Sequence, residues 1–258
     1  MANGKRNLGA AYCLLLLFAC LPSHALNAEG ETEPRTSISF STLLLGKGDF
    51  ENIRFFQGQN NISAPLEFRL VQRCGPYTYS GPREMVFVRE IPAPTDEEPE
   101  AVAYEPVARV NIPEGWDEVL FFFEELSPGE VDKEGKLPFK VHMMDDSFSA
   151  FPVGSLVVFN ACGVPMAGKV GKERARFAPG PAEAINFSNT RDSALTAAFA
   201  IETADGPKLV FENRLEFSES YRIILMLAPP RREGSIRLQV YNIPQFIEET
   251  NQNVRPSD

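Results

Sequence analysis

Short apolar runs, separated by proline, glycine, asparagine and aspartate, limit most strongly how this chain can fold. Few stretches show the 3.6-residue periodicity of an amphipathic helix, whereas many segments of strand length are continuously apolar or alternate. In residues 139–143, for example, Phe, Val and Met alternate with Lys and His, as in a half-buried strand. We therefore expect an all-β protein.

The strands predicted from these runs follow one another about every 10 residues, which is typical of sandwiches and barrels. The predicted strands are Ser37–Leu45, Ile53–Gln57, Leu66–Val71, Met85–Arg89, Val102–Asn111, Glu118–Glu124, Leu137–Met143, Ser155–Asn160, Gly168–Val170, Ala175–Ala178, Ala184–Phe187, Ala194–Ile201, Leu209–Glu212, Tyr221–Leu227 and Ile236–Tyr241.

The polar segment 145–153, DDSFSAFPV, is the best candidate for a domain boundary. It separates residues 37–146 from residues 153–245, and each part has about the size of an immunoglobulin-like sandwich. We expect two packed sandwiches of this kind, followed by a disordered tail over residues 246–258. No internal sequence repeat is evident.

The first 25 residues have the parts of an export signal. Lys5 and Arg6 are followed by an apolar run, and residues 23–25, Ser-His-Ala, form a cleavage site with small residues at −3 and −1. A polar segment, residues 26–36, then leads into the first strand. The apolar run is shorter than the ~20 residues that a membrane-spanning helix needs. We expect a signal peptide and an exported protein.

An alternative interpretation gives the chain a lipid anchor. Residues 17–20, Leu-Phe-Ala-Cys, resemble the lipobox of bacterial lipoproteins, in which the cysteine, here Cys20, is acylated after cleavage. The localisation is then the periplasm, the cell surface or the medium, either free or attached to a membrane through this anchor.

Charge restricts the partners. The chain has 35 acidic and 25 basic residues, and removal of residues 1–25 takes away one Lys and one Arg only. A protein this acidic, with no basic stripe, is repelled by nucleic acid phosphates. We expect an envelope or extracellular partner, and a glycan is one candidate.

Two cysteines remain after removal of the signal, Cys74 and Cys162, each followed by glycine at the end of an apolar run. An oxidising compartment permits a disulfide between them. The other interpretation is two small buried thiols.

Catalytic chemistry finds little support in the sequence. Only two histidines occur, His24 in the signal and His142, so a nucleophile with a histidine base depends on His142. On a predicted strand its position is polar and solvated. We predict no catalytic residue, no metal site and no cofactor, although two carboxylates for glycoside hydrolysis could come from any of the 35 acids.

Aromatic side chains are the remaining binding candidates. Residues 76–82, PYTYSGP, predict a turn-rich loop in which Tyr77 and Tyr79 share one face if the backbone is extended. Trp116 lies in a second predicted loop. Exposed Tyr and Trp side chains can stack on sugar rings, whereas the alternative is that these rings cap the sandwich core.

Several segments resemble a family of uncharacterised secreted bacterial β-rich proteins. They are RCGPYTYSGPREMVFV (73–88), IPEGWDEVLFFF (112–123), MMDDSFSAFPVGSLVVFNACGVPMAGKVG (143–171) and NRLEF with YRIILMLAPP (213–230). The resemblance implies export and an immunoglobulin-like sandwich fold, and it implies no catalytic or binding residue.

The sequence therefore predicts an exported, non-catalytic protein with a binding or structural role at the cell envelope. A carbohydrate-binding module is the first alternative, with Tyr77, Tyr79 and Trp116 as its binding face. A glycoside hydrolase that works through two carboxylates is the second alternative.

Overall fold

The fold was analysed in a computed structural model, which describes residues 35–57, 61–92, 102–134, 137–187, 194–232 and 234–247. These residues form seventeen strands and one short helix, α1 (Pro128–Glu134), and they belong to a single compact unit, Glu33–Asp258. The prediction of an all-β sandwich class is confirmed. The immunoglobulin-like assignment and the division into two domains stay predictions.

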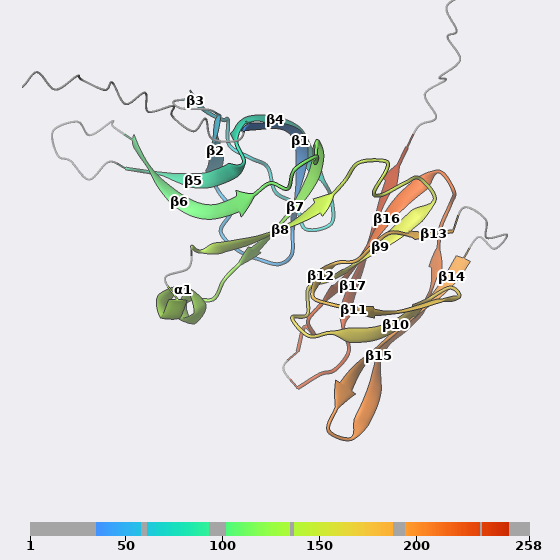
Figure 1. Cartoon of the computed structure of the whole chain (residues 1–258). Helices are drawn as coiled ribbons and strands as arrows, with labels where there is room; N and C mark the ends of the chain where they lie inside the picture. Colours follow the sequence, from blue (N-terminus) through green and yellow to red (C-terminus); the bar gives the residue numbers. More distant parts are fainter. Residues whose placement is uncertain are drawn as a thin grey trace, which may run out of the picture. The chain divides into compact units, whose positions relative to one another are not determined.

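The first eight strands form what we call the N-terminal sandwich (Figure 1). One sheet has the order β4-β1-β7-β8 and the other β3-β2-β5-β6. The strands are β1 (Arg35–Leu44), β2 (Ile53–Gln57), β3 (Asn61–Ile62), β4 (Cys74–Pro82), β5 (Glu84–Pro92), β6 (Val102–Asn111), β7 (Glu118–Glu125) and β8 (Phe139–Asp145).

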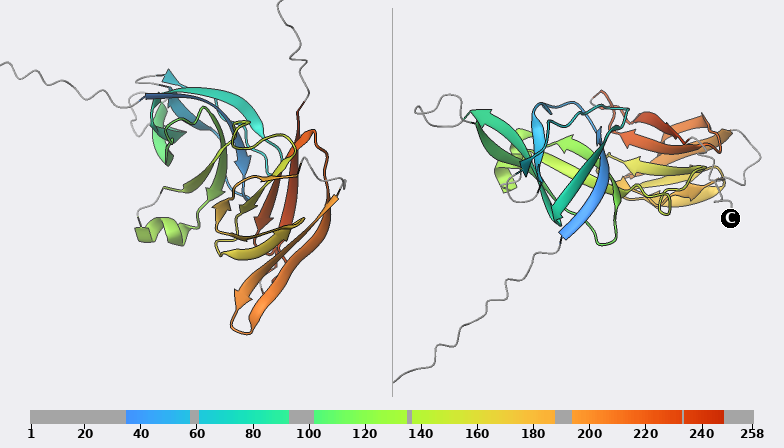
Figure 2. Two further views of the ribbon diagram at one scale, coloured as in Figure 1. Left: turned by 45° about the vertical axis from the view of Figure 1, so that its right-hand side comes forward. Right: turned by 90° about the horizontal axis from the view of Figure 1, so that it is seen from above.

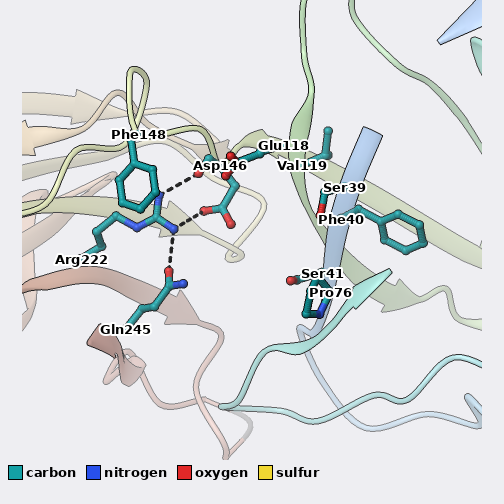
Figure 3. A pocket seen from close by; sticks show the side chains of 10 residues that line it. All are labelled: Ser39, Phe40, Ser41, Pro76, Glu118, Val119, Asp146, Phe148, Arg222 and Gln245. Carbon is teal, nitrogen blue, oxygen red and sulfur yellow. Dashed lines mark hydrogen bonds and ion pairs between the residues drawn. The ribbon is translucent and has the colours of Figure 1, made fainter. Parts of the chain in front are cut away.

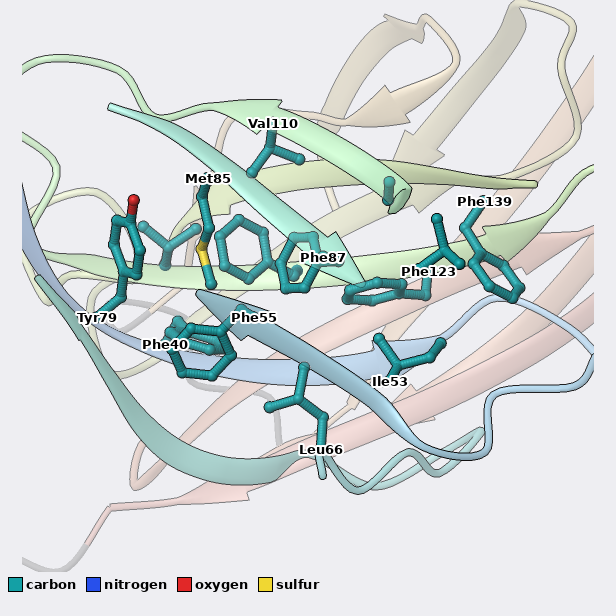
Figure 4. Packing of buried hydrophobic residues seen from close by; sticks show 14 of the residues in the cluster. Phe40, Ile53, Phe55, Leu66, Tyr79, Met85, Phe87, Val110, Phe123 and Phe139 are labelled. Carbon is teal, nitrogen blue, oxygen red and sulfur yellow. The ribbon is translucent and has the colours of Figure 1, made fainter. Parts of the chain in front are cut away.

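Alternation along these strands places one set of side chains between the two sheets. This core is rich in phenylalanine: Phe40, Phe55, Phe87, Phe121 and Phe123 are each at most 2% exposed. Figure 4 shows Phe40, Phe55, Phe87 and Phe123 within it. Their rings meet mainly edge to face, with the centroids of Phe40 and Phe121 5.1 Å apart. Such contacts add to the free energy gained by burying the rings.

The remaining strands form the C-terminal sandwich, shown from two further directions in Figure 2. Its sheets have the orders β12-β9-β16-β17 and β11-β10-β14-β15, and β13 also pairs with β9. The strands are β9 (Ser155–Asn160), β10 (Met166–Val170), β11 (Glu173–Phe177), β12 (Gly180–Pro181), β13 (Ile185–Asn186), β14 (Ala194–Thr203), β15 (Gly206–Glu216), β16 (Tyr221–Ala228) and β17 (Gln239–Phe246).

The two sandwiches repeat one topology. The strands β9, β10, β11, β12, β14, β15, β16 and β17 take the places of β1 to β8 in the two sheet orders. Among the described strands, the only parallel pairs are β1 with β7 and β9 with β16, at the same position in each sandwich. Both sandwiches also have a β-bulge at the equivalent place, and in each the extra residue is a buried valine. Val107 lies opposite the Phe87/Val88 step, and Val210 lies opposite the Phe199/Ala200 step. The chain is therefore a structural duplication without an evident sequence repeat.

A third apolar cluster joins the sandwiches, and we call it the seam. It packs the outer face of sheet β4-β1-β7-β8 against the outer face of sheet β12-β9-β16-β17. Phe122 and Phe159 stack across it with their ring centroids 4.1 Å apart. The members of the seam are Leu43, Leu45, Leu120, Phe122, Met144, Phe151, Val157, Phe159, Ile224, Met226 and Ile243. Because both faces of β7 and β16 are covered, these strands are almost continuously apolar.

Three predicted strands, Ile53–Gln57, Val102–Asn111 and Ser155–Asn160, have the same bounds in the structure. Two predictions were wrong. Residues 66–71 form no strand, and residues 76–82, predicted as a loop, belong to β4. β4 is an edge strand, and edge strands tolerate the prolines that suggested a loop. The predicted signal peptide, Cys20 and residues 248–258 of the predicted tail lie outside the described residues, whereas Phe246, the first residue of that tail, ends β17.

Candidate functional site: a charged pocket at the seam

Arg222 is the most deeply buried charge of the described residues. It lies on β16 with a relative exposure of 3%, on the same face as Ile224 and Met226 of the seam. Its Nη1 donates hydrogen bonds to the carbonyl oxygens of Asp146 at 2.7 Å and Phe151 at 3.1 Å. These bonds hold the connection between the two sandwiches against β16.

Asp146 is the counter-charge. Its carboxylate is close to both Arg73 and Arg222, with Arg222 Nη2 3.5 Å from Asp146 Oδ1. Arg222 Nη2 also donates to Gln245 Oε1 at 2.7 Å. Because a buried charge without a partner is costly, the three charged side chains depend on one another.

Several polar atoms of this cluster have no hydrogen-bond partner. Nε of Arg222, Nε and Nη2 of Arg73, and Oδ1 of Asp146 are buried without a hydrogen bond. Buried polar groups usually find partners, so each such atom is a place where a ligand or water could bind. Two of the three residues, Asp146 and Arg222, line a pocket.

The seam pocket, as we name it, has a volume of about 210 Å³. Arg222, Phe148 and Gln245 lie on one side of it, and Ser39, Ser41 and Pro76 lie on the other (Figure 3). Phe148 is 50% exposed, and the Arg222 guanidinium lies 4.7 Å from the centre of its ring. The pocket therefore combines a ring with hydroxyl, amide, carboxylate and guanidinium groups.

Two charges of the pocket, those of Glu118 and Arg222, come from equivalent positions of the two sandwiches. Ser39 is paired with Glu118 on the parallel neighbour of β1, and Ser155 is paired with Arg222 on the parallel neighbour of β9. Equivalent positions thus carry opposite charges, and both Glu118 and Arg222 line the pocket. Burial lowers the pKa of Arg222, Asp146 and Glu118 oppose this, and the Arg73 charge adds to it.

The predicted aromatic face is part of the N-terminal core. Tyr79 is 2% exposed, and its hydroxyl donates to the carbonyl oxygen of Pro82 at 2.6 Å. Tyr77 is half-buried against Phe40, and its hydroxyl accepts a hydrogen bond from the Glu67 amide. Trp116 is also half-buried against this core. Tyr77 and Tyr79 do share one face of β4, but it is the inward face.

Cys74 and Cys162 are free thiols in the structure. Cys74 is buried at the start of β4, and Cys162 is half-buried behind β9 with its Sγ 3.4 Å from the carbonyl oxygen of Leu227. Burial raises the pKa of both thiols, that of Cys162 to about 11.

His142 is not isolated in solvent, because it packs on Phe159 and its Nε2 lies 3.2 Å from Glu124 Oε2. This hydrogen bond is the main cause that lowers the pKa of Glu124, with burial acting in the opposite direction. Within the described ranges, no three His, Cys, Asp or Glu side chains gather as metal ligands would.

Sequence reasoning missed Arg222 and Phe148. Arg222 lies inside an apolar run, and a charge there was the one available signal, since buried charges are rare without partners. Phe148 lies in the segment that was interpreted only as a boundary.

No protein-family model matches the chain, and no curated protein matches it significantly. No helix in the described part of the chain is long and apolar enough to cross a membrane.

Proposed function

We propose that this chain is an exported, non-catalytic binding protein of the cell envelope, whose ligand enters the seam pocket. The observation that carries the proposal is a buried ion cluster with unpaired polar atoms, placed at a pocket between two sandwiches that share a core. A site made by two packed sheets is held rigidly, which lowers the entropic cost of binding.

The seam pocket favours the end of a carbohydrate chain as its ligand. This pocket replaces the face of Tyr77, Tyr79 and Trp116 that the sequence predicted. One face of Phe148 is covered by Arg222, and half of its surface is open. An open aromatic ring beside carboxylate, amide and hydroxyl groups suits a sugar ring, which has both apolar faces and hydroxyls.

Hydrolysis of a glycoside is less well supported, although Glu118 and Asp146 both line the pocket. Glycosidases need two carboxyl groups that are free to act on the substrate. Asp146 is instead ion-paired with Arg73 and Arg222, so its carboxylate is not free to act as an acid or a nucleophile.

Saturation-transfer NMR of the protein with a panel of mono- and oligosaccharides at millimolar concentration tests this function. We expect Phe148→Ala to lose most of the signal. Phe246→Ala is the matched control, because Phe246 is 57% exposed and also contacts a ring, that of Tyr221. Equal signals from both variants would exclude the seam pocket.

Intact mass of the processed protein tests export. Free export predicts a chain that begins near Leu26, whereas a lipoprotein begins at the acylated Cys20.

A further inference from the structure

The charges at the seam pocket offset one another. Glu118, Asp146 and Arg222 are the charged side chains of its lining, and Arg73, which is not part of the lining, pairs with Asp146. Burial lowers the pKa of Arg222, and the charges that also shift it are those of Asp146, Arg73 and Glu118. Two guanidinium groups are therefore matched by two carboxylates, and this set of four side chains is neutral as a whole.

The duplicated fold shows where these charges come from. Glu118 and Arg222 are equivalent, and each has a partner on the next strand of its sheet. The amide of Asp146 donates to the carbonyl oxygen of Glu118, and Gln245 is paired with Arg222. The N-terminal sandwich thus contributes two carboxylates at positions where the C-terminal sandwich has a guanidinium and a neutral amide. Arg73 supplies the second positive charge.

Three of the four charges are held by the protein itself. Arg222 donates to two carbonyl oxygens and to Gln245, and Asp146 is ion-paired with both arginines. Glu118 is different, because among the described residues its carboxylate has neither a hydrogen bond nor an ion pair. It is half-buried and lies next to Asp146 in the pocket (Figure 3). Glu118 is thus the charge that is left for a ligand.

The uncharged polar groups of the lining are also open to a ligand. Ser39, Ser41 and Gln245 are half-buried, and the two hydroxyls have no hydrogen bond with a described residue. Gln245 accepts from Arg222 through Oε1, which leaves its amide nitrogen as a donor. Together with the acceptor oxygens of Glu118, these groups suit sugar hydroxyls, which both donate and accept.

The connection between the sandwiches explains why these groups are open on one side only. Ser155 is the equivalent of Ser39, and its hydroxyl donates to the carbonyl oxygen of Pro152 in that connection, so Ser155 is fully buried. Ser39 lies inside β1, whose earlier residues 35–38 continue the pairing with β4. No comparable turn of the described chain covers Ser39, and the pocket opens there.

A ligand that carries a charge would disturb the neutral set. A charge without a partner is costly in a site that is shielded from water. The carboxylate of an acidic sugar would meet Glu118, whereas the bonded donors of Arg222 are already in use. The ammonium group of an amino sugar would add a positive charge to two guanidiniums whose counter-charges are already present.

We propose that the seam pocket selects an uncharged sugar unit and that Glu118 determines this specificity. Glu118 accepts hydrogen bonds from the hydroxyls of the sugar, and its charge offsets the second guanidinium of the cluster. This inference rests on the proposed function, because it concerns the same carbohydrate ligand.

Matched sugars are the probes, namely glucose, glucuronic acid and glucosamine, and galactose with its corresponding acid and amine. Titrations of the full chain are followed by saturation-transfer NMR at slightly acidic pH, where the sugar amines are protonated. In at least one set we expect the neutral sugar to bind at least tenfold more tightly than the acid and the amine.

Exchange of one charge tests the role of Glu118. Glu118→Gln leaves the cluster with one positive charge, so we expect binding of the acidic sugar to improve at least tenfold and binding of the amino sugar not to improve. Glu114→Gln is the matched control, because it removes one charge from the same sandwich where the side chain is 91% exposed. The control should keep the preference of the unchanged protein.

Removal of hydroxyls tests the contacts to the sugar. Ser39→Ala with Ser41→Ala should weaken binding of the neutral sugar about tenfold, since two hydrogen bonds are lost. Ser37→Ala, on the same strand but exposed, should leave the Kd unchanged. All variants are checked for an unchanged urea midpoint.

The outcomes separate this inference from the proposed function. If no sugar of either set binds the unchanged protein, the carbohydrate function itself is wrong. If sugars bind but the acid or the amine binds as tightly as the neutral sugar, only the selection by charge is overturned. Equal preferences of Glu118→Gln and Glu114→Gln would overturn the role of Glu118.

Discussion

The N-terminal and C-terminal sandwiches share their strand order, their one parallel pair and a valine bulge, yet they fill their cores differently. Phe87 pairs with Phe55, whereas the equivalent Phe199 pairs with Gly168. The space above Gly168 is taken by the rings of Phe177 and Phe199. One topology therefore accepts different core side chains as long as the volume of the core is filled.

Surface charge separates the two sandwiches as clearly as their cores do. Residues 35–146 contain 20 acidic and 11 basic side chains, whereas residues 147–247 contain 9 acidic and 11 basic ones. The sandwiches therefore present different surfaces to partners, although their backbones follow the same path. Substitutions at equivalent positions and at the seam test how far the two sandwiches act as equals and as one unit.

The largest effect is expected from the equivalent core rings. Phe87→Ala and Phe199→Ala should each lower the free energy of unfolding by about 3–5 kcal/mol, because both side chains are fully buried. Trp116, the single tryptophan, reports on the N-terminal sandwich. If the seam couples the sandwiches, Phe199→Ala shifts the urea midpoint seen by Trp116 fluorescence. An unchanged midpoint would mean that the sandwiches unfold independently.

Breaking the ion cluster at the seam should have the next largest effect. Asp146→Ala leaves Arg73 and Arg222 buried without their counter-charge, and we expect a loss of about 3 kcal/mol in urea unfolding. Glu84→Gln is the control, because its pair with Arg109 is more than half exposed on both sides and should change stability by less than about 1 kcal/mol. Similar losses in both variants would contradict the role assigned to Asp146.

Overpacking at Gly168 should cost less. An added Cβ would lie 2.6 Å from atoms of both Phe177 and Phe199, so Gly168→Ala should destabilise by about 1–3 kcal/mol. At Gly46 nothing lies within 4 Å of an added Cβ, and Gly46→Ala should be nearly neutral. A neutral Gly168→Ala would show that the C-terminal core has room that the rings do not fill.

Acid should reveal a smaller effect at Glu124. The hydrogen bond from His142 lowers the pKa of Glu124 in the folded state, so the pair stabilises the fold above the ordinary Glu pKa of about 4.3. This contribution is lost as the pH falls through the folded-state pKa. Glu124→Gln should therefore flatten the acid limb of urea midpoint against pH, and an unchanged acid limb would argue against this pair.

The smallest effect is expected from reduction, because Cys74 and Cys162 are free thiols in the folded protein. With pKa values raised by burial, Cys74 and Cys162 should react slowly with Ellman's reagent in the folded protein and at once in urea. Free thiols give the same intact mass with and without reductant. A two-dalton gain on reduction would show instead the disulfide that the sequence allowed.

The sequence by itself determined the fold class and many strands. Ile53–Gln57, Val102–Asn111 and Ser155–Asn160 were found with their bounds because alternation and apolar runs are local properties. β4 was missed because its prolines and glycines are tolerated at the edge of a sheet, and being an edge strand is a property of the whole fold.

Only the tertiary structure decided the duplication and the seam pocket. Arg222 meets Asp146, 76 residues earlier, through pairing of β9 with β16 and packing at the seam. Such relations join residues that are far apart in the chain, and no local pattern of side chains encodes which strand will become a neighbour.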